Sequence, residues 1–156
     1  MRTRTHAVIA TFFMLAAATI ARAEGMTLKQ VAELRAVSDA VISPRGDMIA
    51  FTRVVPRELI EEEDGPAWTE LHLIDDRGRE RPFITGQVNV RSIGWMPDGS
   101  AVTFLARRDG DEHTRLYAIP VDGGEAHPLA TLETSINSYT FSPDGSSVAL
   151  LAFEPD

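Results

Sequence analysis

Three short stretches of the sequence repeat one another: SPRGDMIAF at residues 43–51, MPDGSAVTF at 96–104 and SPDGSSVAL at 142–150. Their prolines lie about 50 residues apart, a period typical of solenoids and propellers. In each stretch, proline presets the backbone for the first central turn position, and glycine accepts the left-handed conformation that follows. The repeats therefore predict three β-hairpin turns of one kind.

Apolar residues alternate with other residues on both sides of each turn. A period of two on both arms predicts that one face of each hairpin lies against a core. The alternating residues are Ala40, Ile42, Ile49 and Phe51 around the first turn, Ile93, Trp95, Val102 and Phe104 around the second, and Tyr139, Phe141, Val148 and Leu150 around the third.

A second hairpin follows in the first two repeats. Its strands are predicted at 70–74 and 81–84 in the first repeat, and at 114–119 and 127–129 in the second. Pro82 and Pro128 fit only an edge strand, because proline cannot donate to a central ladder. Four strands per repeat, with proline tolerated in the last, predict a propeller blade. A β-sandwich remains the alternative, since short strands with turn signals also fit it.

The predicted fold class is therefore all-β, an incomplete β-propeller of about two and a half four-stranded blades with WD40-like repeats. Blade one spans 37–86, blade two 90–133, and half of blade three 135–156. Propellers typically contain about four to eight blades, so we expect the sequence to be the front part of a longer protein. The apolar strand at 147–153 would then present an open edge, which favours self-association of the isolated chain.

Residues 1–23 have the features of a signal peptide. Two arginines precede an apolar run at 7–20, and Ala-Arg-Ala at 21–23 is a typical cleavage site that would leave Glu24 as the mature N-terminus. The run is shorter than the ~20 residues that a membrane-spanning helix needs. An uncleaved anchor or a buried helix is the alternative. We expect an exported protein, periplasmic or secreted, without a membrane anchor after cleavage.

Residues 24–36 form a predicted leader with one short helix. Thr27 and Gln30 have the spacing of a capping box, and Leu28, Val31 and Leu34 follow with helical spacing. The leader is short, so no further domain is expected between the signal peptide and blade one.

The composition argues against several classes of function. The sequence has no cysteine, which excludes disulfides, thiolate metal sites and a cysteine nucleophile. Its formal net charge of −8 argues against binding to nucleic acid, which requires clustered basic residues.

No catalytic, cofactor-binding or metal-binding residue is predicted, and no cofactor is expected. The sequence lacks the G-x-S-x-G motif of α/β-hydrolases, and its histidines lack zinc-ligand spacing. We interpret His72, His113 and His127 as surface strand or turn residues. The acidic run at 108–112 lacks the spacing of a calcium loop and is interpreted as a solvated hairpin loop.

A second acidic run, at residues 61–64, could bind a cationic partner. We favour a flexible, solvated loop for Glu61, Glu62 and Glu63, because charge runs are usually solvated.

The stretch LRAVSDAVISPRGDMIAF at 34–51 resembles the start of secreted prolyl-oligopeptidase-family serine peptidases, a group that includes dipeptidyl aminopeptidases and acylaminoacyl peptidases. The resemblance covers residues 27–156. It implies a propeller that restricts the access of small peptides to a C-terminal α/β-hydrolase domain of the same protein. That domain and the peptide substrates are the implied partners, and the family's catalytic positions have no counterpart in this sequence.

Two details depart from the family pattern. Arg45 and Met96 replace the usual Asp and Ser of the turn, and a type I turn tolerates both. Some members bind the substrate amine through a glutamate pair in the propeller, but no matching motif surrounds residues 61–63, so this role is not transferred.

TolB-like periplasmic propellers use similar SPDG repeats and give the alternative function, a binding or scaffold protein without catalysis. The short leader favours the peptidase, because a TolB-like chain would carry a separate α/β domain before its repeats.

Overall fold

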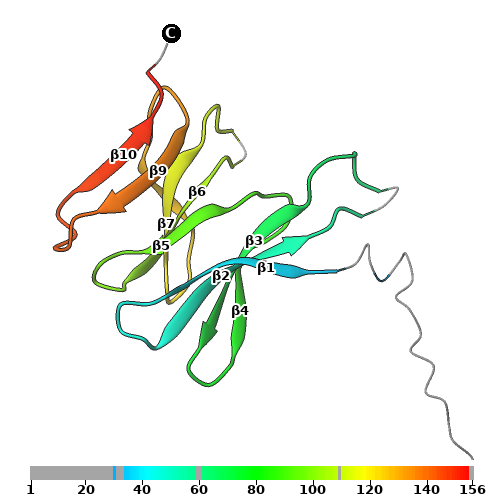
Figure 1. Ribbon diagram of the computed structural model, residues 1–156, viewed down its shortest axis with the longest axis horizontal. Coiled ribbons are helices and arrows are strands. Elements are labelled where there is room, and N and C mark those ends of the chain that lie inside the picture. Colours follow the sequence, from blue (N-terminus) through cyan, green and yellow to red (C-terminus); the bar gives the residue numbers. More distant parts are fainter. Residues whose placement is uncertain (1–29, 31–33, 59–60, 109, 155–156) are drawn as a thin grey trace, which may run out of the picture.

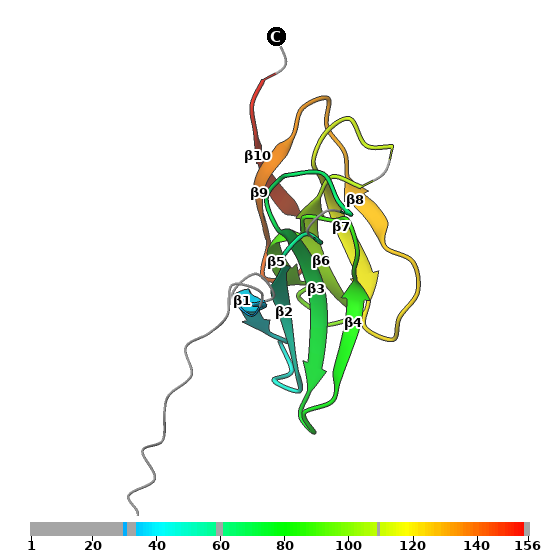
Figure 2. The same ribbon diagram turned by 90° about the vertical axis from the view of Figure 1, so that its right-hand side faces the viewer.

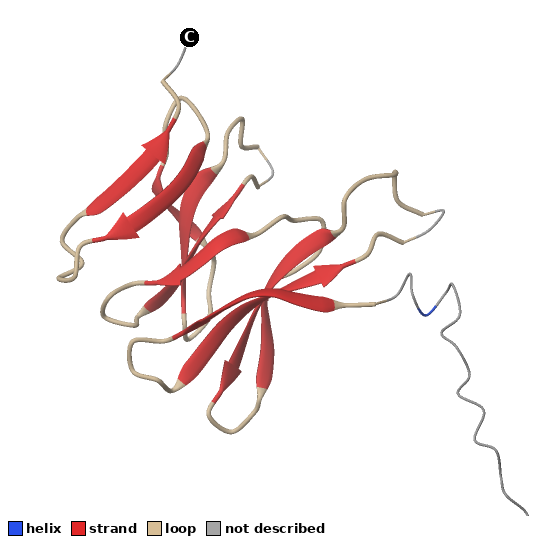
Figure 3. Ribbon diagram, viewed as in Figure 1, coloured by secondary structure: helices blue, strands red, loops and turns tan. Residues whose placement is uncertain are grey.

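The computed structural model describes residue 30 and residues 34–58, 61–108 and 110–154. These residues form ten β-strands in three antiparallel sheets, which confirms the all-β class (Figure 3). The predicted signal peptide and most of the predicted leader helix lie outside the described residues. No helix in the described part is long and apolar enough to cross a membrane.

The two four-stranded sheets follow chain order from one edge to the other, so each is a simple meander. Pro82 and Pro128 lie on the predicted edge strands, β4 (Glu80–Ile84) and β8 (His127–Ala130). Blade one contains β1 (Ala36–Ile42), β2 (Met48–Val55), β3 (Trp68–Asp75) and β4 (Glu80–Ile84); blade two contains β5 (Arg91–Trp95), β6 (Ala101–Ala106), β7 (Arg115–Pro120) and β8 (His127–Ala130). A third sheet, which we call hairpin three, pairs β9 (Ile136–Phe141) with β10 (Val148–Ala152).

The three sheets lie side by side like the ribs of a fan (Figure 1). Figure 2, turned by 90°, shows the strands of blade one in the order β1 to β4. β1 lies beside β5, so the first strands of the two blades are neighbours. This is the arrangement of an incomplete propeller, in which successive sheets stack face to face.

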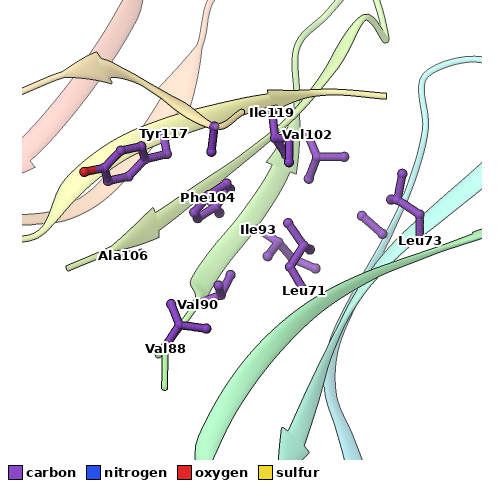
Figure 4. Packing of buried hydrophobic residues seen from close by; sticks show 12 residues of the cluster. Leu71, Leu73, Val88, Val90, Ile93, Val102, Phe104, Ala106, Tyr117 and Ile119 are labelled. Atoms are coloured by element: carbon purple, nitrogen blue, oxygen red, sulfur yellow. The ribbon is translucent and has the colours of Figure 1, made fainter. Parts of the chain in front are cut away.

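Each sheet has two faces, which we call A and B. Face A carries the alternating apolar residues that flank the turn, and face B is the opposite side. The main core lies between face B of blade one and face A of blade two (Figure 4). Leu71 and Leu73 of β3 pack there with Val102, Phe104 and Tyr117 of blade two. Full burial of an apolar side chain of this size stabilises the fold by about 1.5–3 kcal/mol.

A second cluster lies between face B of blade two and face A of hairpin three. Leu105, Leu116 and Ile136 are fully buried, and partly buried side chains of hairpin three pack against them: Tyr139, Phe141, Val148 and Leu150. The predicted inward face is thus confirmed for the second and third hairpins.

The same prediction is wrong for part of blade one. Phe51 is buried, but Ile42 and Ile49 are 67% and 38% exposed. In the other two sheets, the preceding sheet covers face A. No described residue covers these two isoleucines in that way, so the alternating pattern does not bring them into a core.

The turns follow the predicted geometry, with left-handed glycines at φ 74° for Gly46, 72° for Gly99 and 70° for Gly145. In the second and third turns the aspartate side chain bonds to the serine two residues later. Asp98 Oδ1 accepts from Ser100 N at 2.9 Å, and Asp144 Oδ1 accepts from Ser146 N at 3.1 Å. These bonds hold the turn closed.

Arg45 gives the first turn a different set of contacts. In this turn the carboxylate that accepts a hydrogen bond belongs to Asp47, whose Oδ1 accepts from Ser43 Oγ at 2.7 Å. Arg45 instead reaches the second turn, where its Nη2 donates to Asp98 O at 3.2 Å. The arginine that the turn was expected only to tolerate therefore links blade one to blade two.

The turn carboxylates make stability depend on pH. The Ser142 hydroxyl, with the backbone and hydroxyl of Ser146, lowers the pKa of Asp144 to about 2. A pKa depressed in the folded state contributes stability above the ordinary value of 3.8, and this contribution is lost as pH falls toward about 2. We expect Asp144→Asn to lower the urea midpoint at pH 7, with a difference from the unsubstituted chain that shrinks between pH 4 and pH 2. Circular dichroism measures both midpoints.

The matched control is Asp122→Asn, an exposed turn aspartate whose side chain has no hydrogen-bond partner among the described residues. It should leave the midpoint unchanged at every pH. An Asp144→Asn difference that stays constant between pH 7 and pH 2 would contradict the assignment.

Candidate functional site

Polar residue pairs occupy equivalent places near the start of the first strand of each sheet. They precede the turn proline by the same distance in each repeat. The pairs are Ser38-Asp39 in β1, Arg91-Ser92 in β5 and Asn137-Ser138 in β9. We call these six residues the polar rim. β1 and β5 are neighbours, and Arg91 of β5 bonds to β9. The rim therefore runs along one end of these three first strands.

The backbone of the rim is irregular. The pairing of β1 with β2 shifts between Val37 and Asp39, and that of β5 with β6 shifts between Arg91 and Gly94. Ser92 has a φ of 50°, the one positive value among the described residues other than glycine. Bulges re-aim side chains, and strained backbone concentrates at functional sites. These features distinguish the rim from an ordinary strand end.

Two side chains tie the rim of β5 to β9. Arg91 donates from Nη1 to Asn137 O at 3.1 Å and from Nη2 to Ile136 O at 2.9 Å. Tyr139 Oη donates to Ser92 O at 2.9 Å and lies 2.8 Å from Thr103 Oγ1. These bonds hold the strained Ser92 in place.

Tyr139 remains a neutral donor at physiological pH. Burial is the main cause that raises its pKa to about 12, and the nearby carboxylate of Asp39 acts in the same direction, against the hydrogen bond from Thr103. The hydroxyl therefore keeps its proton for the bond to Ser92 O.

Gly94 makes room for this hydroxyl. A Cβ at Gly94 would lie 2.9 Å from Tyr139 Oη and 3.2 Å from Thr103 Oγ1. A glycine inside a strand can mark a close approach of another group, and this was the one sequence signal that could have located the contact.

The rim presents polar groups that are suited to hydrogen bonding. Asp39 offers a carboxylate, and Ser92 and Ser138 are exposed. Ser38 Oγ is engaged with Thr52 Oγ1 at 2.8 Å. In the described part of the chain, no serine hydroxyl bonds to a histidine, as an activated nucleophile would require. The same part contains no group of three or more acidic or histidine side chains that could hold a metal ion.

In the described part of the loop between β2 and β3, a side chain predicted to be solvated has several hydrogen-bond partners. Glu62 accepts from Trp68 Nε1 and Gln87 Nε2, both at 3.1 Å, and from Glu58 N at 2.9 Å. The bond from Glu58 N is the main cause that lowers the pKa of Glu62. The expectation of a solvated side chain is therefore wrong for Glu62, while Glu61 and Glu63 are exposed.

Trp68 also contacts Arg57, a residue of this loop. The guanidinium carbon of Arg57 lies 4.0 Å from the centre of the Trp68 ring, and Nε donates to Pro66 O at 2.9 Å. A cation over an indole ring is a favourable arrangement that adds to the bonds of Glu62. The described loop residues Arg57 and Glu62 thus both contact Trp68, the first residue of β3.

The run at 108–112 also departs from its prediction as a solvated loop. Asp111 is buried and accepts from Tyr117 Oη at 2.5 Å and from Arg108 N at 2.9 Å, and it pairs with Arg115 at 3.1 Å. Burial opposes its ionisation, but these bonds and charges outweigh burial and lower its pKa. Asp111 thus contacts residues at the start of β7.

His72 is the third correction, because it is buried and not on the surface. Its ring stacks on Phe51 with 5.5 Å between centroids. Nε2 lies 3.2 Å from Glu70 Oε2, and Nδ1 lies 3.0 Å from Glu80 Oε1. Glu80 also pairs with Arg53, so charged side chains cover this part of face A.

The other two histidines match their predicted settings. His113 lies in the loop before β7, and His127 is exposed at the start of β8.

A shallow groove of about 570 Å³ lies at the turn end of blade one. Two of its arginines are engaged within the protein: Arg79 bonds to Asp75 at 2.7 Å, and Arg81 Nη2 donates to Val121 O at 3.1 Å. The groove is a weaker candidate than the rim because its three arginines face three aspartates. Its lining residues are Asp47, Met48, Asp75, Asp76, Arg77, Arg79 and Arg81.

Comparisons with known proteins bear on the fold of this chain. Comparisons with protein-family models and with characterised protein sequences found no match. A structure described as TolB from Agrobacterium tumefaciens is similar over 75% of this chain, with a TM-score of 0.55 and 20% identity. TolB from Acinetobacter baumannii is similar over 71%, with a TM-score of 0.50 and 22% identity. This chain spans 39% and 25% of their lengths. The likeness supports a β-propeller fold.

The contact between Gly94 and Tyr139 predicts a non-additive pair of substitutions. Gly94→Ala places a methyl group against the Tyr139 hydroxyl and should destabilise the fold by about 1–3 kcal/mol, the usual cost of overpacking. Tyr139→Phe alone should cost about 1 kcal/mol through its lost hydrogen bonds. Because phenylalanine removes the clashing oxygen, the double variant should be more stable than the sum of the two losses. Urea unfolding of the four proteins measures the coupling.

Gly124→Ala with Tyr139→Phe is the control pair, since a Cβ at Gly124 meets no atom within 4 Å. Its two effects should add. Additive effects for the Gly94 pair as well would show that the hydroxyl does not occupy the space beside Gly94.

Proposed function

We propose that the chain is a propeller module that binds polypeptide partners at the polar rim, in the manner of a TolB-like binding or scaffold protein. The observation that carries the proposal is the repeated, bulged rim on a propeller fold similar to that of TolB structures. Loops and irregular strand ends positioned by a rigid sheet are the usual sites of binding.

The chemistry of the rim suits a peptide segment better than nucleic acid. Asp39 contributes a negative charge, and Ser92 and Ser138 are exposed. Arg91, the rim's one basic residue, already donates two bonds to carbonyls of β9. Hydroxyl and carboxylate groups can bond to the backbone amides of an extended chain.

The proposed site of action is outside the cytoplasm. The support comes from residues 1–23, whose basic start, apolar run and Ala-Arg-Ala end are typical of a signal peptide.

A second candidate is the propeller of an exported serine peptidase that gates peptides toward an α/β-hydrolase domain. The sequence LRAVSDAVISPRGDMIAF favours it, through its resemblance to the start of such peptidases. This function also uses a propeller and peptide partners, but it requires a nucleophile from residues outside this sequence. Reading the coding DNA beyond codon 156 separates the two candidates: an in-frame G-x-S-x-G motif supports the peptidase, and its absence from the full reading frame supports the binding module.

Binding at the rim can be tested by site-specific photocrosslinking. A photoreactive amino acid replaces Ser138 on the rim or, as the control, Asp122 on a turn at the other end of the strands. We expect discrete protein adducts from position 138 and none from position 122, in cells that export the chain. Asp39→Arg should abolish the adducts at 138 while circular dichroism shows an unchanged fold.

Adducts of equal yield at both positions, or no adducts at 138, would contradict binding at the rim. Mass spectrometry of the adducts identifies the partner segment and shows whether it is extended polypeptide.

A further inference from the structure

Asp39 is a carboxylate of the polar rim that lies on the side of β1 facing blade two. The pairing of β1 with β2 is regular from Asp39 to Ile42, so Asp39 points to the same side of the strand as Val41. Val41 packs against the core between the two blades, and its carbonyl accepts from Trp95 Nε1 of β5 at 3.1 Å. The carboxylate therefore stands where the first strands of two neighbouring blades come together.

The charge of Asp39 also reaches the contact between β5 and β9. Burial is the main cause that raises the pKa of Tyr139 to about 12, and the carboxylate of Asp39 acts in the same direction. An effect of this kind requires a nearby charge. Asp39 thus lies close to the Tyr139 hydroxyl, which bonds to Ser92 O. Residues of β1, β5 and β9 meet near one carboxylate.

No residue in the part of the chain that the structure describes neutralises this carboxylate. Asp39 is exposed, and its side chain forms no ion pair or hydrogen bond with a described residue. Arg91 is the one basic residue of the rim, and it donates its two hydrogen bonds to the carbonyls of Ile136 and Asn137. The rim therefore presents a negative charge that its own six residues leave unpaired.

We propose that the polar rim selects polypeptide segments that present a cationic group, which pairs with Asp39. This inference rests on the proposed binding function and adds the charge of the partner. An ammonium or guanidinium group carries only N–H donors, and the rim offers acceptors in the carboxylate of Asp39 and the exposed hydroxyls of Ser92 and Ser138. The formal net charge of −8 favours the same partners at longer range.

The cation can come from a lysine or arginine side chain or from the N-terminal amine of the segment. Synthetic peptides separate these sources. The probes are alternating alanine–serine peptides, blocked at both ends, with lysine, norleucine or glutamate at the centre. A fourth probe is the norleucine peptide with a free N-terminal amine. Each is crosslinked, below saturation, to the full chain that carries the photoreactive amino acid in place of Ser138.

We expect the blocked lysine peptide to give about two- to fivefold more adduct than the blocked norleucine peptide at low salt, the size of effect that an exposed ion pair produces. The glutamate peptide should give the least. The preference should vanish at ~1 M salt, where the Debye length is about 3 Å. If the fourth probe matches the lysine peptide, the rim accepts a terminal ammonium as well as a side chain.

Substitutions at Asp39 show whether this carboxylate is the cause. Asp39→Asn keeps the shape of the side chain and removes its charge, so the lysine and norleucine peptides should give equal yields. Asp39→Glu should restore the preference. Asp122→Asn is the matched control, because it removes one exposed negative charge from the turn after β7 and should leave the preference unchanged. It separates local pairing from attraction to the net charge of the chain.

Equal yields from the lysine and norleucine peptides, or a preference that survives Asp39→Asn, would overturn the cationic preference and leave binding at the rim intact. If no peptide forms an adduct, the adducts formed in cells decide. Asp39→Asn should then lower their yield, and an unchanged yield overturns the inference. The absence of adducts both in cells and with the peptides would instead contradict the binding function itself.

Discussion

The structure depends on one repeated interaction, the packing of face A of each sheet on face B of the sheet before it. A single four-stranded meander has two faces and cannot bury both alone. Stacking solves this for the inner faces, where Leu71 of blade one and Phe104 of blade two are fully buried in one cluster. Because each sheet contacts only its neighbours, stability is shared between adjacent pairs and not concentrated in one centre.

The stacking explains which parts of the fold could be predicted from the sequence. Turn glycines, alternating strands and prolines on edge strands are local features, and the structure contains each of them, as with Gly99 and Pro128. Periodicity shows that a face is apolar, but it cannot show whether another sheet covers it. Ile42 has the same local pattern as Trp95, and only the neighbouring sheet separates their environments.

The predictions for three polar residues were wrong for the same reason. Glu62, His72 and Asp111 each belong to sequences that favour solvent, yet each has partners from other strands or loops. Gln87 bonds to Glu62 from 25 residues away, and Glu80 of β4 approaches His72 of β3. A buried charge is stable only when such partners are present, and sequence spacing does not specify them.

The polar rim shows how stacking and strain are related. Face-to-face packing fixes β5 and β9 relative to each other, so Tyr139 can reach across to the carbonyl of Ser92. That bond and those of Arg91 hold a backbone conformation that a non-glycine residue seldom adopts. Strain of this kind persists only where surrounding contacts over-determine it. The rim is therefore a product of the sheet interface, and a substitution that loosens the interface will also relax the site.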